Sequence, residues 1–228
     1  MADIYFVPPS QWLDNSVVVL DKALKKRFFK VMRFSEGDEI VITDGRGRLA
    51  TGILDEDKIN IFHIEACEDD RLPIDVYLPL IKGERMEWAI AKLGEIGVRS
   101  ITPVITERSV VKKFSDNKRE RCSRLLASAL EIRRLCWKTE CREPRRLQDV
   151  LGNIDYYLDM NGQSLYNVNL RFPLSVIIGP EGGFSDDEKR SLESSGVKGI
   201  SLGRAVLRAE TAAIVGVSLI AFAGGVMM

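Results

Sequence analysis

The sequence predicts an α/β protein in which a small N-terminal β-barrel precedes an α/β domain. Short β-rich segments separated by turn residues occupy residues 4–67, whereas strands and helices alternate from residue 75 onward. An acidic stretch at residues 68–73 separates the two patterns. The chain of 228 residues is long enough for two modest domains. We therefore expect domains at residues 1–70 and 73–228.

The N-terminal pattern consists of strands and one helix. The β-rich runs at residues 38–43 and 48–54 flank Asp-Gly-Arg-Gly at residues 44–47. Asp-Gly between two such runs predicts a hairpin, because glycine adopts the positive φ of the tight turn without steric cost. Residues 58–67 predict a further strand, and residues 21–31 a basic helix. Several short strands at close spacing must close or stack to hide their edges, so we expect a barrel.

The C-terminal pattern predicts a mostly parallel sheet. Strands are expected at residues 75–80, 100–104, 154–158, 174–178 and 199–202. Helices are expected at residues 84–96 and 117–136, after Ser185, and from Glu210. Alternation of strands and helices is typical of a parallel sheet that is covered on both faces.

The last helix is strongly apolar. Residues 212–228 contain no charge over 17 positions, and this stretch is shorter than the ~20 residues that cross a bilayer. It also contains three glycines and has no aromatic or basic residue after it. We therefore expect a buried helix and no membrane span. A helix that is apolar all round needs cover on all sides, and we expect a second subunit to cover it around Ile220.

Composition excludes several classes of function. No charged segment followed by an apolar run opens the sequence, which predicts a cytoplasmic protein. The four cysteines form no Cys-x-x-Cys pair and His63 is the single histidine, so no metal site is expected. In a cytosolic protein the thiols are expected to be reduced. His63 lies in an alternating β segment, on the face opposite its apolar neighbours.

Positive charge is unevenly distributed although Lys and Arg balance Asp and Glu at 33 each. Residues 108–146 carry 13 Lys or Arg against five acids. A second basic cluster comprises Lys22, Lys25, Lys26, Arg27, Lys30 and Arg33. Such clusters are either solvated helix faces or attract phosphates in a salt-sensitive way. Charge alone does not separate the two interpretations.

Two glycine loops carry the strongest functional signal. The first, Gly-Pro-Glu-Gly-Gly-Phe-Ser at residues 179–185, follows a buried strand and leads into a helix through a Ser-x-x-Glu capping box. The second, Leu-Gly-Arg-Ala-Val-Leu-Arg-Ala-Glu-Thr-Ala at residues 202–212, repeats this order. Glycines allow close approach of the backbone to a ligand at the strand ends, so we expect one shared pocket. The acids at residues 186–188 disfavour a nucleoside triphosphate. Arg204, Arg208 and Glu210 alternatively form a structural ion-pair cluster that caps the last helix.

The two loops resemble the RsmE family, the SPOUT-class uridine-N3 methyltransferases of small-subunit ribosomal RNA. Lys-Gly-Glu-Arg-Met-Glu-Trp at residues 82–88, Gly-Glu-Ile-Gly-Val at 94–98 and Ile-Thr-Pro-Val-Ile-Thr-Glu-Arg-Ser at 101–109 resemble the family's other blocks in the same order. The resemblance implies a PUA-like barrel for RNA and a SPOUT domain with a C-terminal trefoil knot. It further implies a homodimer that uses S-adenosylmethionine to methylate N3 of a specific uridine in 16S ribosomal RNA, within the small ribosomal subunit.

The resemblance also implies roles for individual residues. The expected cofactor-binding residues are Met160, Ile178, Gly179, Pro180, Glu181, Gly182, Gly183, Leu202, Gly203, Leu207 and Thr211. At Gly182, a side chain is expected to fill space that the backbone and the cofactor share. Arg208 is expected to stabilise negative charge on the uracil oxygens. Glu210 or Glu181 is expected to take the proton or to hold Arg208.

RNA binding is assigned to the basic residues. The expected set is Lys25, Lys26, Arg27, Lys30, Arg33, Arg108, Arg133 and Arg134. The family's Gln and spaced Arg on the long helix are not matched, and Arg133 or Arg134 is expected to supply the guanidinium in their place.

Two other functions stay open at this level. One is a SPOUT methyltransferase that acts on another RNA or on a ribose hydroxyl. The other is a non-catalytic RNA-binding ribosome assembly factor with a decayed cofactor loop. Intact Gly182, Gly183, Arg208 and Glu210 argue against decay.

Overall fold

The computed structural model describes residues 3–226, which form two compact units. The first unit comprises the chain up to Asp70 together with Ala127–Lys138. The second comprises Arg71–Leu126 and the chain from Thr139 onward. The first unit therefore contains a segment that the sequence places in the second domain.

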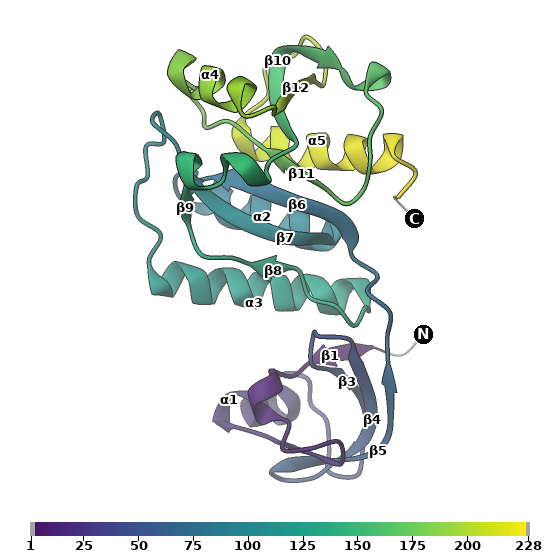
Figure 1. The fold of residues 1–228 in the computed structure, drawn as a ribbon. Coiled ribbons are helices and arrows are strands. Elements are labelled where there is room, and N and C mark those ends of the chain that lie inside the picture. The colour runs from purple at the N-terminus through teal and green to yellow at the C-terminus, as the bar shows by residue number, and fades with distance from the viewer. Residues whose placement is uncertain (1–2, 227–228) are drawn as a thin grey trace. The chain divides into compact units, whose positions relative to one another are not determined.

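The first unit is built on a five-stranded sheet (Figure 1). The strand order is β1 (Ile4–Phe6), β3 (Glu39–Thr43), β4 (Arg48–Leu54), β5 (Lys58–Ala66) and β2 (Val17–Val19). β1 pairs with β3 in parallel, and the other pairs are antiparallel. The predicted hairpin between β3 and β4 is confirmed, with Gly45 and Gly47 at φ values of 70° and 91°.

The first unit contains one short helix near its start and a longer helical segment where the sequence predicts the basic helix. Pro9–Gln11 form the short 3-10 helix η1. α1 (Lys22–Lys25) continues directly into the π-helix η2 (Lys26–Val31). The Asp21 carboxylate caps α1 by accepting a hydrogen bond from the Leu24 amide at 2.8 Å. His63 lies in β5, and its side chain is exposed, as the alternation predicts.

Residues 127–138 belong to the first unit because their side chains contact its sheet. The Glu131 carboxylate accepts a hydrogen bond from the Phe6 amide at 2.7 Å and pairs with Arg27 at 2.5 Å. The Trp137 ring lies against Gly47, where a Cβ atom would come within 2.5 Å of the ring. Only glycine fits under this tryptophan.

A disulfide joins Cys67 to Cys136 within the first unit. The Cα atoms are 6.3 Å apart, within the range that a disulfide spans. This corrects the expectation that all the thiols are reduced. The pair is 69 residues apart in sequence and comes together because residues 127–138 return to the sheet. Cys122 and Cys141 are free.

The second unit contains a parallel sheet, as predicted. The strand order is β12 (Lys198–Ser201), β10 (Tyr156–Ser164), β11 (Leu174–Ile177), β6 (Leu72–Pro79), β7 (Val98–Ile105) and β8 (Glu140–Cys141), and β9 (Arg145–Arg146) also pairs with β7. All these pairs are parallel. Three short 3-10 helices lie between strands: η3 (Leu147–Asp149), η4 (Leu151–Asn153) and η5 (Leu165–Asn167).

Four longer helices accompany this sheet: α2 (Glu84–Ile96), α3 (Asp116–Arg133), α4 (Asp186–Ser194) and α5 (Ala209–Ala223). The predicted capping box of α4 is confirmed, because Ser185 Oγ accepts from the Glu188 amide and Glu188 accepts from the Ser185 amide. α2 ends at Gly97, whose φ of 89° stops the helix. α3 runs from the second unit into the first.

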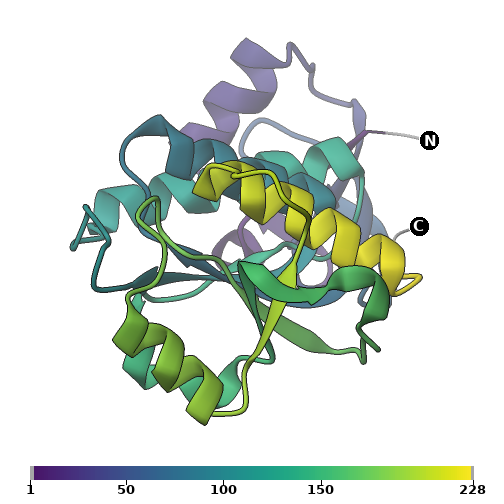
Figure 2. The same ribbon diagram turned by 90° about the horizontal axis from the view of Figure 1, so that it is seen from above.

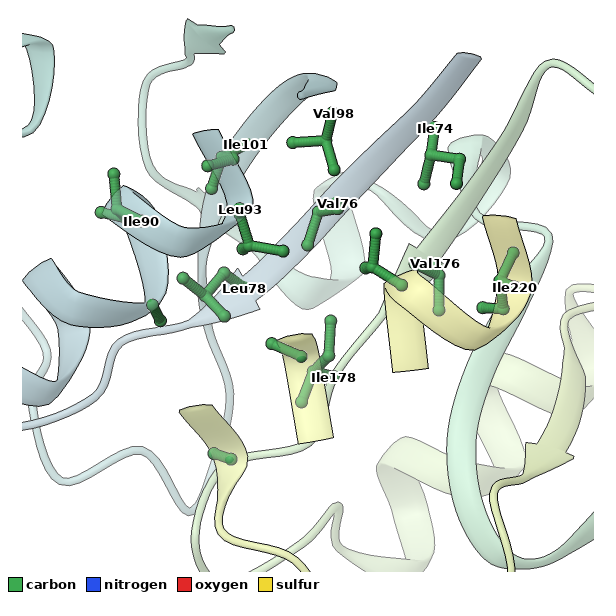
Figure 3. Packing of buried hydrophobic residues seen from close by; sticks show 14 of the residues in the cluster. Ile74, Val76, Leu78, Ile90, Leu93, Val98, Ile101, Val176, Ile178 and Ile220 are labelled. Carbon is green, nitrogen blue, oxygen red and sulfur yellow. The ribbon is translucent and has the colours of Figure 1, made fainter. Parts of the chain in front are cut away.

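Alternate residues of the central strands enter two cores on opposite faces of the sheet. Val76 and Leu78 of β6 pack in one cluster, and Tyr77 between them packs in the other. Ile90 of α2 and Ile220 of α5 belong to the first cluster, which Figure 3 shows from close by. This two-residue period explains why the strands read as nearly continuous apolar runs.

α5 is covered by its own chain. It packs against α2 and β6, and Figure 2 shows α5 running beside α2. Ala213, Val217 and Ile220 are fully buried there. The expectation that a second subunit covers Ile220 is therefore wrong. The opposite side of the helix is apolar but exposed, with Leu219 38% and Phe222 75% accessible.

Within residues 3–226, no helix has both the length and the apolar character that a bilayer crossing requires. In the same part of the chain, no group of three or more His, Cys, Asp or Glu side chains could hold a metal ion. Residues 227 and 228 of the predicted last helix lie outside the described residues.

Candidate functional site

A cavity of about 310 Å³ lies in the second unit, at the carboxyl ends of β11 and β12 and beside residues 158–160 of β10. These strands are neighbours in the sheet, so their carboxyl ends share one edge. The lining comes from Lys189 and from three segments: residues 158–160, 178–181 with 183–184, and parts of 200–212 that leave out Arg208, Glu210 and Thr211. Both glycine loops therefore line one cavity.

Most of the expected cofactor-binding residues line the cavity: Met160, Ile178, Gly179, Pro180, Glu181, Gly183, Leu202, Gly203 and Leu207. Gly182 and Thr211 do not line it. A Cβ atom at Gly182 would meet the Arg108 side chain at 3.5 Å, an ordinary van der Waals distance. The expectation that a Gly182 side chain would enter ligand space is therefore corrected.

Glycine is required at two other positions of the lining. Gly183 and Gly203 have φ values of 66° and 124°, a region that residues with a side chain rarely adopt. A Cβ atom at either position would have no heavy atom within 4 Å, so it would occupy open space. The Gly183 amide donates to the Pro180 carbonyl at 2.8 Å, which closes the turn of the first loop.

An ion pair that the sequence did not predict also lines the cavity. Lys189 Nζ lies 2.6 Å from Asp159 Oδ2, and the Asp159 side chain is 12% exposed. Burial disfavours ionisation of Asp159, but hydrogen bonds from Lys189 and the Asn161 amide outweigh it and lower its pKa. Asp159 lies within the stretch from Leu158 to Gln163 where the pairing of β10 with β12 shifts, and such irregularities re-aim side chains. In the sequence, Asp159 directly follows the strand predicted at residues 154–158, and this position could have marked it as a site residue.

The loop after β7 braces the first glycine loop. Arg108 Nη1 donates to the Gly182 carbonyl at 2.9 Å. The Glu107 amide donates to Glu188 Oε1 at 2.7 Å, and Lys112 Nζ donates to the Glu107 carbonyl at 2.7 Å. Arg108, expected to bind RNA, thus holds the loop that lines the cavity.

Glu210 pairs with a residue that the sequence did not single out. Arg85 Nη1 lies 3.8 Å from Glu210 Oε1, and Arg85 Nη2 lies 3.2 Å from Glu181 Oε1. Glu210 Oε2 is buried and has no hydrogen-bond partner among the described residues. Arg208 is exposed, and within residues 3–226 its side chain forms no ion pair. The alternative of a structural Arg208–Glu210 pair is not what the structure contains.

The other expected RNA-binding residues lie in the first unit. Lys26, Lys30 and Arg33 are exposed, and Lys25 is half-buried. Three arginines already have acidic neighbours: Arg27 pairs with Glu131, Arg134 pairs with Asp3 at 2.7 Å, and Arg133 interacts with Asp70. Burial lowers the pKa of Arg133, and Asp70 opposes this effect. Among the described residues, the exposed Lys26, Lys30 and Arg33 form no ion pair.

Fold and cavity together define an α/β ligand-binding protein with a separate β unit. Residues 68–221 match the family model of the RNA methyltransferase domain, and residues 28–62 match that of the RNA methyltransferase PUA domain. The chain therefore combines a PUA-like domain with a methyltransferase domain and is an RNA methyltransferase.

Comparison with individual relatives identifies the family of RNA methyltransferases to which the chain belongs. The chain is 31% identical over 222 residues to the ribosomal RNA small subunit methyltransferase E of Bacillus subtilis, covering 84% of both chains. It is 30% identical over 206 residues to the protein of that name from Aquifex aeolicus, covering 85% of this chain and 90% of the relative. A Legionella pneumophila methyltransferase structure in complex with the cofactor SAM (S-adenosylmethionine) is similar with a TM-score of 0.88, at 26% identity and over 98% of both chains. The chain belongs to the RsmE family, as its two glycine loops predict.

Proposed function

We propose that this protein transfers the methyl group of S-adenosylmethionine to N3 of a specific uridine in 16S ribosomal RNA, within the small ribosomal subunit. The observation that carries the proposal is the single cavity that both glycine loops line in a chain of the RsmE family. The Bacillus subtilis and Aquifex aeolicus relatives are named for small-subunit ribosomal RNA. The Legionella pneumophila relative binds S-adenosylmethionine.

The cavity offers this cofactor open space beside backbone groups. Open space lies beside Gly183 and Gly203, so backbone groups are accessible to a ligand there. The carboxylates of Glu181 and Asp159 line the cavity as members of ion pairs with Arg85 and Lys189, so polar side chains lie beside the open space. When bound, S-adenosylmethionine supplies a methyl group on a positively charged sulfur. The backbone of residues 179–183 and 202–203, together with Leu207, would hold it.

Arg208 and Glu210 are proposed to act on the uridine. N3 of uracil carries a proton, so its methylation needs a group that accepts this proton. Glu210 has a buried carboxylate oxygen without a partner and is therefore available as an acceptor. Arg208 directly precedes α5, next to the cavity-lining Leu207, and its exposed guanidinium can donate to uracil oxygens as negative charge develops.

RNA binding by the first unit is testable through its salt dependence. Changing Lys22, Lys26 and Lys30 together to Ala should reduce the slope of log K against log salt by about 2, because each phosphate contact to single-stranded RNA contributes about 0.7 to the slope. Binding of 16S ribosomal RNA fragments across a salt series measures this slope. Lys58→Ala is the control, because its ammonium already lies 3.8 Å from Asp55. An unchanged slope in the triple variant would contradict RNA binding by this surface.

The first glycine loop offers a matched pair of variants. Gly183→Ala should weaken S-adenosylmethionine binding about tenfold, because an L-residue at this φ costs roughly 1–2 kcal/mol. Gly182→Ala should bind normally, because its Cβ would make only ordinary contact with Arg108. Calorimetric titration of both variants measures the difference. Equal affinities would place the cofactor away from Gly183.

Finer features of the family are part of the proposal. The sheet of the first unit would close as a PUA-like barrel, and the C-terminal segment would form a trefoil knot. Support for the knot comes from α5, which follows the edge strand β12 yet packs against α2 and β6, beyond β10 and β11. The exposed apolar side chains Leu219 and Phe222 support a homodimer that uses this face of α5. A ribosomal RNA substrate supports the cytoplasmic location expected from the sequence.

Methylation of ribosomal RNA tests the proposal directly. The purified protein and labelled S-adenosylmethionine are incubated with 16S ribosomal RNA that lacks the modification, as free RNA and as small subunits. Mass spectrometry of the nucleosides should detect 3-methyluridine at one position. Label on a ribose hydroxyl would favour the alternative SPOUT activity. Absence of transfer with both substrates would favour the non-catalytic alternative.

A further inference from the structure

We infer that Arg85 is a positioning residue that joins Glu181 to Glu210 and orients the Glu210 carboxylate to take the uridine proton. The inference rests on the proposed function, and it separates two roles that the sequence leaves open between Glu181 and Glu210. In this arrangement Glu181 anchors the first glycine loop, and Glu210 accepts the proton.

The geometry is that of a bridge. One guanidinium nitrogen of Arg85 lies 3.2 Å from Glu181 and another lies 3.8 Å from Glu210. Glu181 belongs to the first glycine loop, and Glu210 belongs to the second, in the part that forms the first turn of α5. Arg85 therefore connects two loops that are about 30 residues apart in sequence and line the same cavity.

The location of Arg85 on α2 argues against a role in helix stability. Arg85 is the second residue of α2, where the helix dipole disfavours a positive charge. The preceding Gly83 contributes no side-chain cap. Its ion-pair partners, Glu181 and Glu210, both lie outside α2. The interactions of Arg85 therefore serve the loops.

Arginine suits this bridge better than lysine. Its planar guanidinium presents several donors in fixed directions, so two carboxylates can be held at once. The Lys ammonium is a compact charge on a flexible stem and fixes neither carboxylate in orientation. Lys at position 85 should therefore restore charge without restoring the full arrangement.

Glu210 has one oxygen toward Arg85, and the other has no hydrogen-bond partner within residues 3–226. Its side chain is 7% exposed, and a buried carboxylate needs a nearby positive charge. Arg85 supplies that charge at Oε1, which leaves Oε2 as a buried acceptor. In the proposed step the N3–H bond breaks and the proton goes to Oε2, which is buried in the ligand-free protein and has to become accessible when the uridine binds. The electron pair left on N3 forms the bond to the methyl carbon, and the pair of the broken carbon–sulfur bond stays on sulfur.

Double-mutant kinetics test whether Arg85 acts through Glu210. In single-turnover methylation, Arg85→Gln and Glu210→Gln should each lower the rate by ~10²-fold or more. The double variant should be less than about threefold slower than Glu210→Gln, because groups that act as a unit are not additive. Arg85→Lys should recover the rate only in part, and the Kd for S-adenosylmethionine should change less than about threefold in Arg85→Gln. If the rate loss of the double variant equals the product of the two single losses, the inference is overturned.

A control variant separates this effect from the loss of any ion pair on α2. Arg121 Nε lies 2.7 Å from Glu87 of α2, outside the cavity lining. Arg121→Gln should keep the wild-type rate. A rate loss in Arg121→Gln equal to that of Arg85→Gln would also overturn the inference.

Hydrogen exchange of the ligand-free protein gives a readout that needs no activity. Amides of residues 179–185 should exchange faster in Arg85→Gln and, to the same extent, in Glu181→Gln. Amide exchange at wild-type rates in both variants would contradict the proposed bridging role of Arg85. Failure of the proposed function is distinguishable, because it would appear as absence of methyl transfer by the wild type, whereas failure of the inference alone leaves the wild type active.

Discussion

Arg208→Ala is expected to lower the single-turnover rate of uridine methylation by about 10² to 10³, the scale found when one donor to a transition-state charge is removed. Arg208 lies at the start of α5, is exposed, and forms no ion pair within the described residues. Its guanidinium is therefore available to the substrate. Uracil gains negative charge on its oxygens as N3 loses its proton, and a donor there stabilises the transition state more than the ground state.

Three accompanying measurements make this prediction specific. S-adenosylmethionine affinity should change little, because Arg208 does not line the cavity. Thermal stability should also be kept, because Glu210 pairs with Arg85 and not with Arg208. Arg208→Lys should remain impaired, because an ammonium lacks the planar pair of donors. Arg204→Ala, an exposed arginine of the same loop, serves as the control.

The opposite pattern would remove Arg208 from the chemistry. If Arg208→Ala keeps a near-normal rate while the protein melts at lower temperature, the side chain has a structural role only. A rate loss shared equally by Arg204→Ala would indicate general attraction of RNA by the loop.

Ile220→Asp should lower the free energy of unfolding by more than about 4 kcal/mol, which is close to the whole stability of many domains. Ile220 is fully buried in the main core of the second unit. The change loses roughly 1.5–3 kcal/mol of apolar burial and places an unpaired carboxylate in the core. Denaturant unfolding measures the loss, and we expect little folded protein to be recovered.

Phe222→Asp is the matched variant on the other side of α5. The side chain is 75% exposed, so stability of the single chain should be nearly unchanged. If this face joins two copies, analytical ultracentrifugation should show a wild-type dimer and a monomeric variant. A wild type that sediments as a monomer would contradict the proposed homodimer. A fully stable Ile220→Asp would contradict the packing of α5 on α2 and β6.

Local features of this protein could be predicted from its sequence because their causes lie within a few residues. The hairpin at residues 44–47 depends on glycines that adopt positive φ, and the capping box at Ser185 depends on a residue three positions away. Strand and helix alternation predicted the parallel sheet. Most of the cavity lining was also predictable, because parallel strands place their carboxyl ends on one edge.

Contacts between distant residues were decided by the tertiary structure alone. The bridge of Arg85 to Glu181 and Glu210, and the pair of Asp159 with Lys189, join elements that no local pattern connects. Only the packed structure shows that a side chain at Gly182 would contact Arg108.

The tertiary structure also decided what buries the apolar helix α5 and which cysteines form a disulfide. Residues 212–228 signal that α5 must be buried, but only the packed chain shows that α2 and β6 bury it. Cys67 and Cys136 meet because residues 127–138 return to the first unit. Propensity, capping and periodicity act over a few residues and are encoded in the order of the chain, whereas side-chain pairing depends on the paths of whole elements through space.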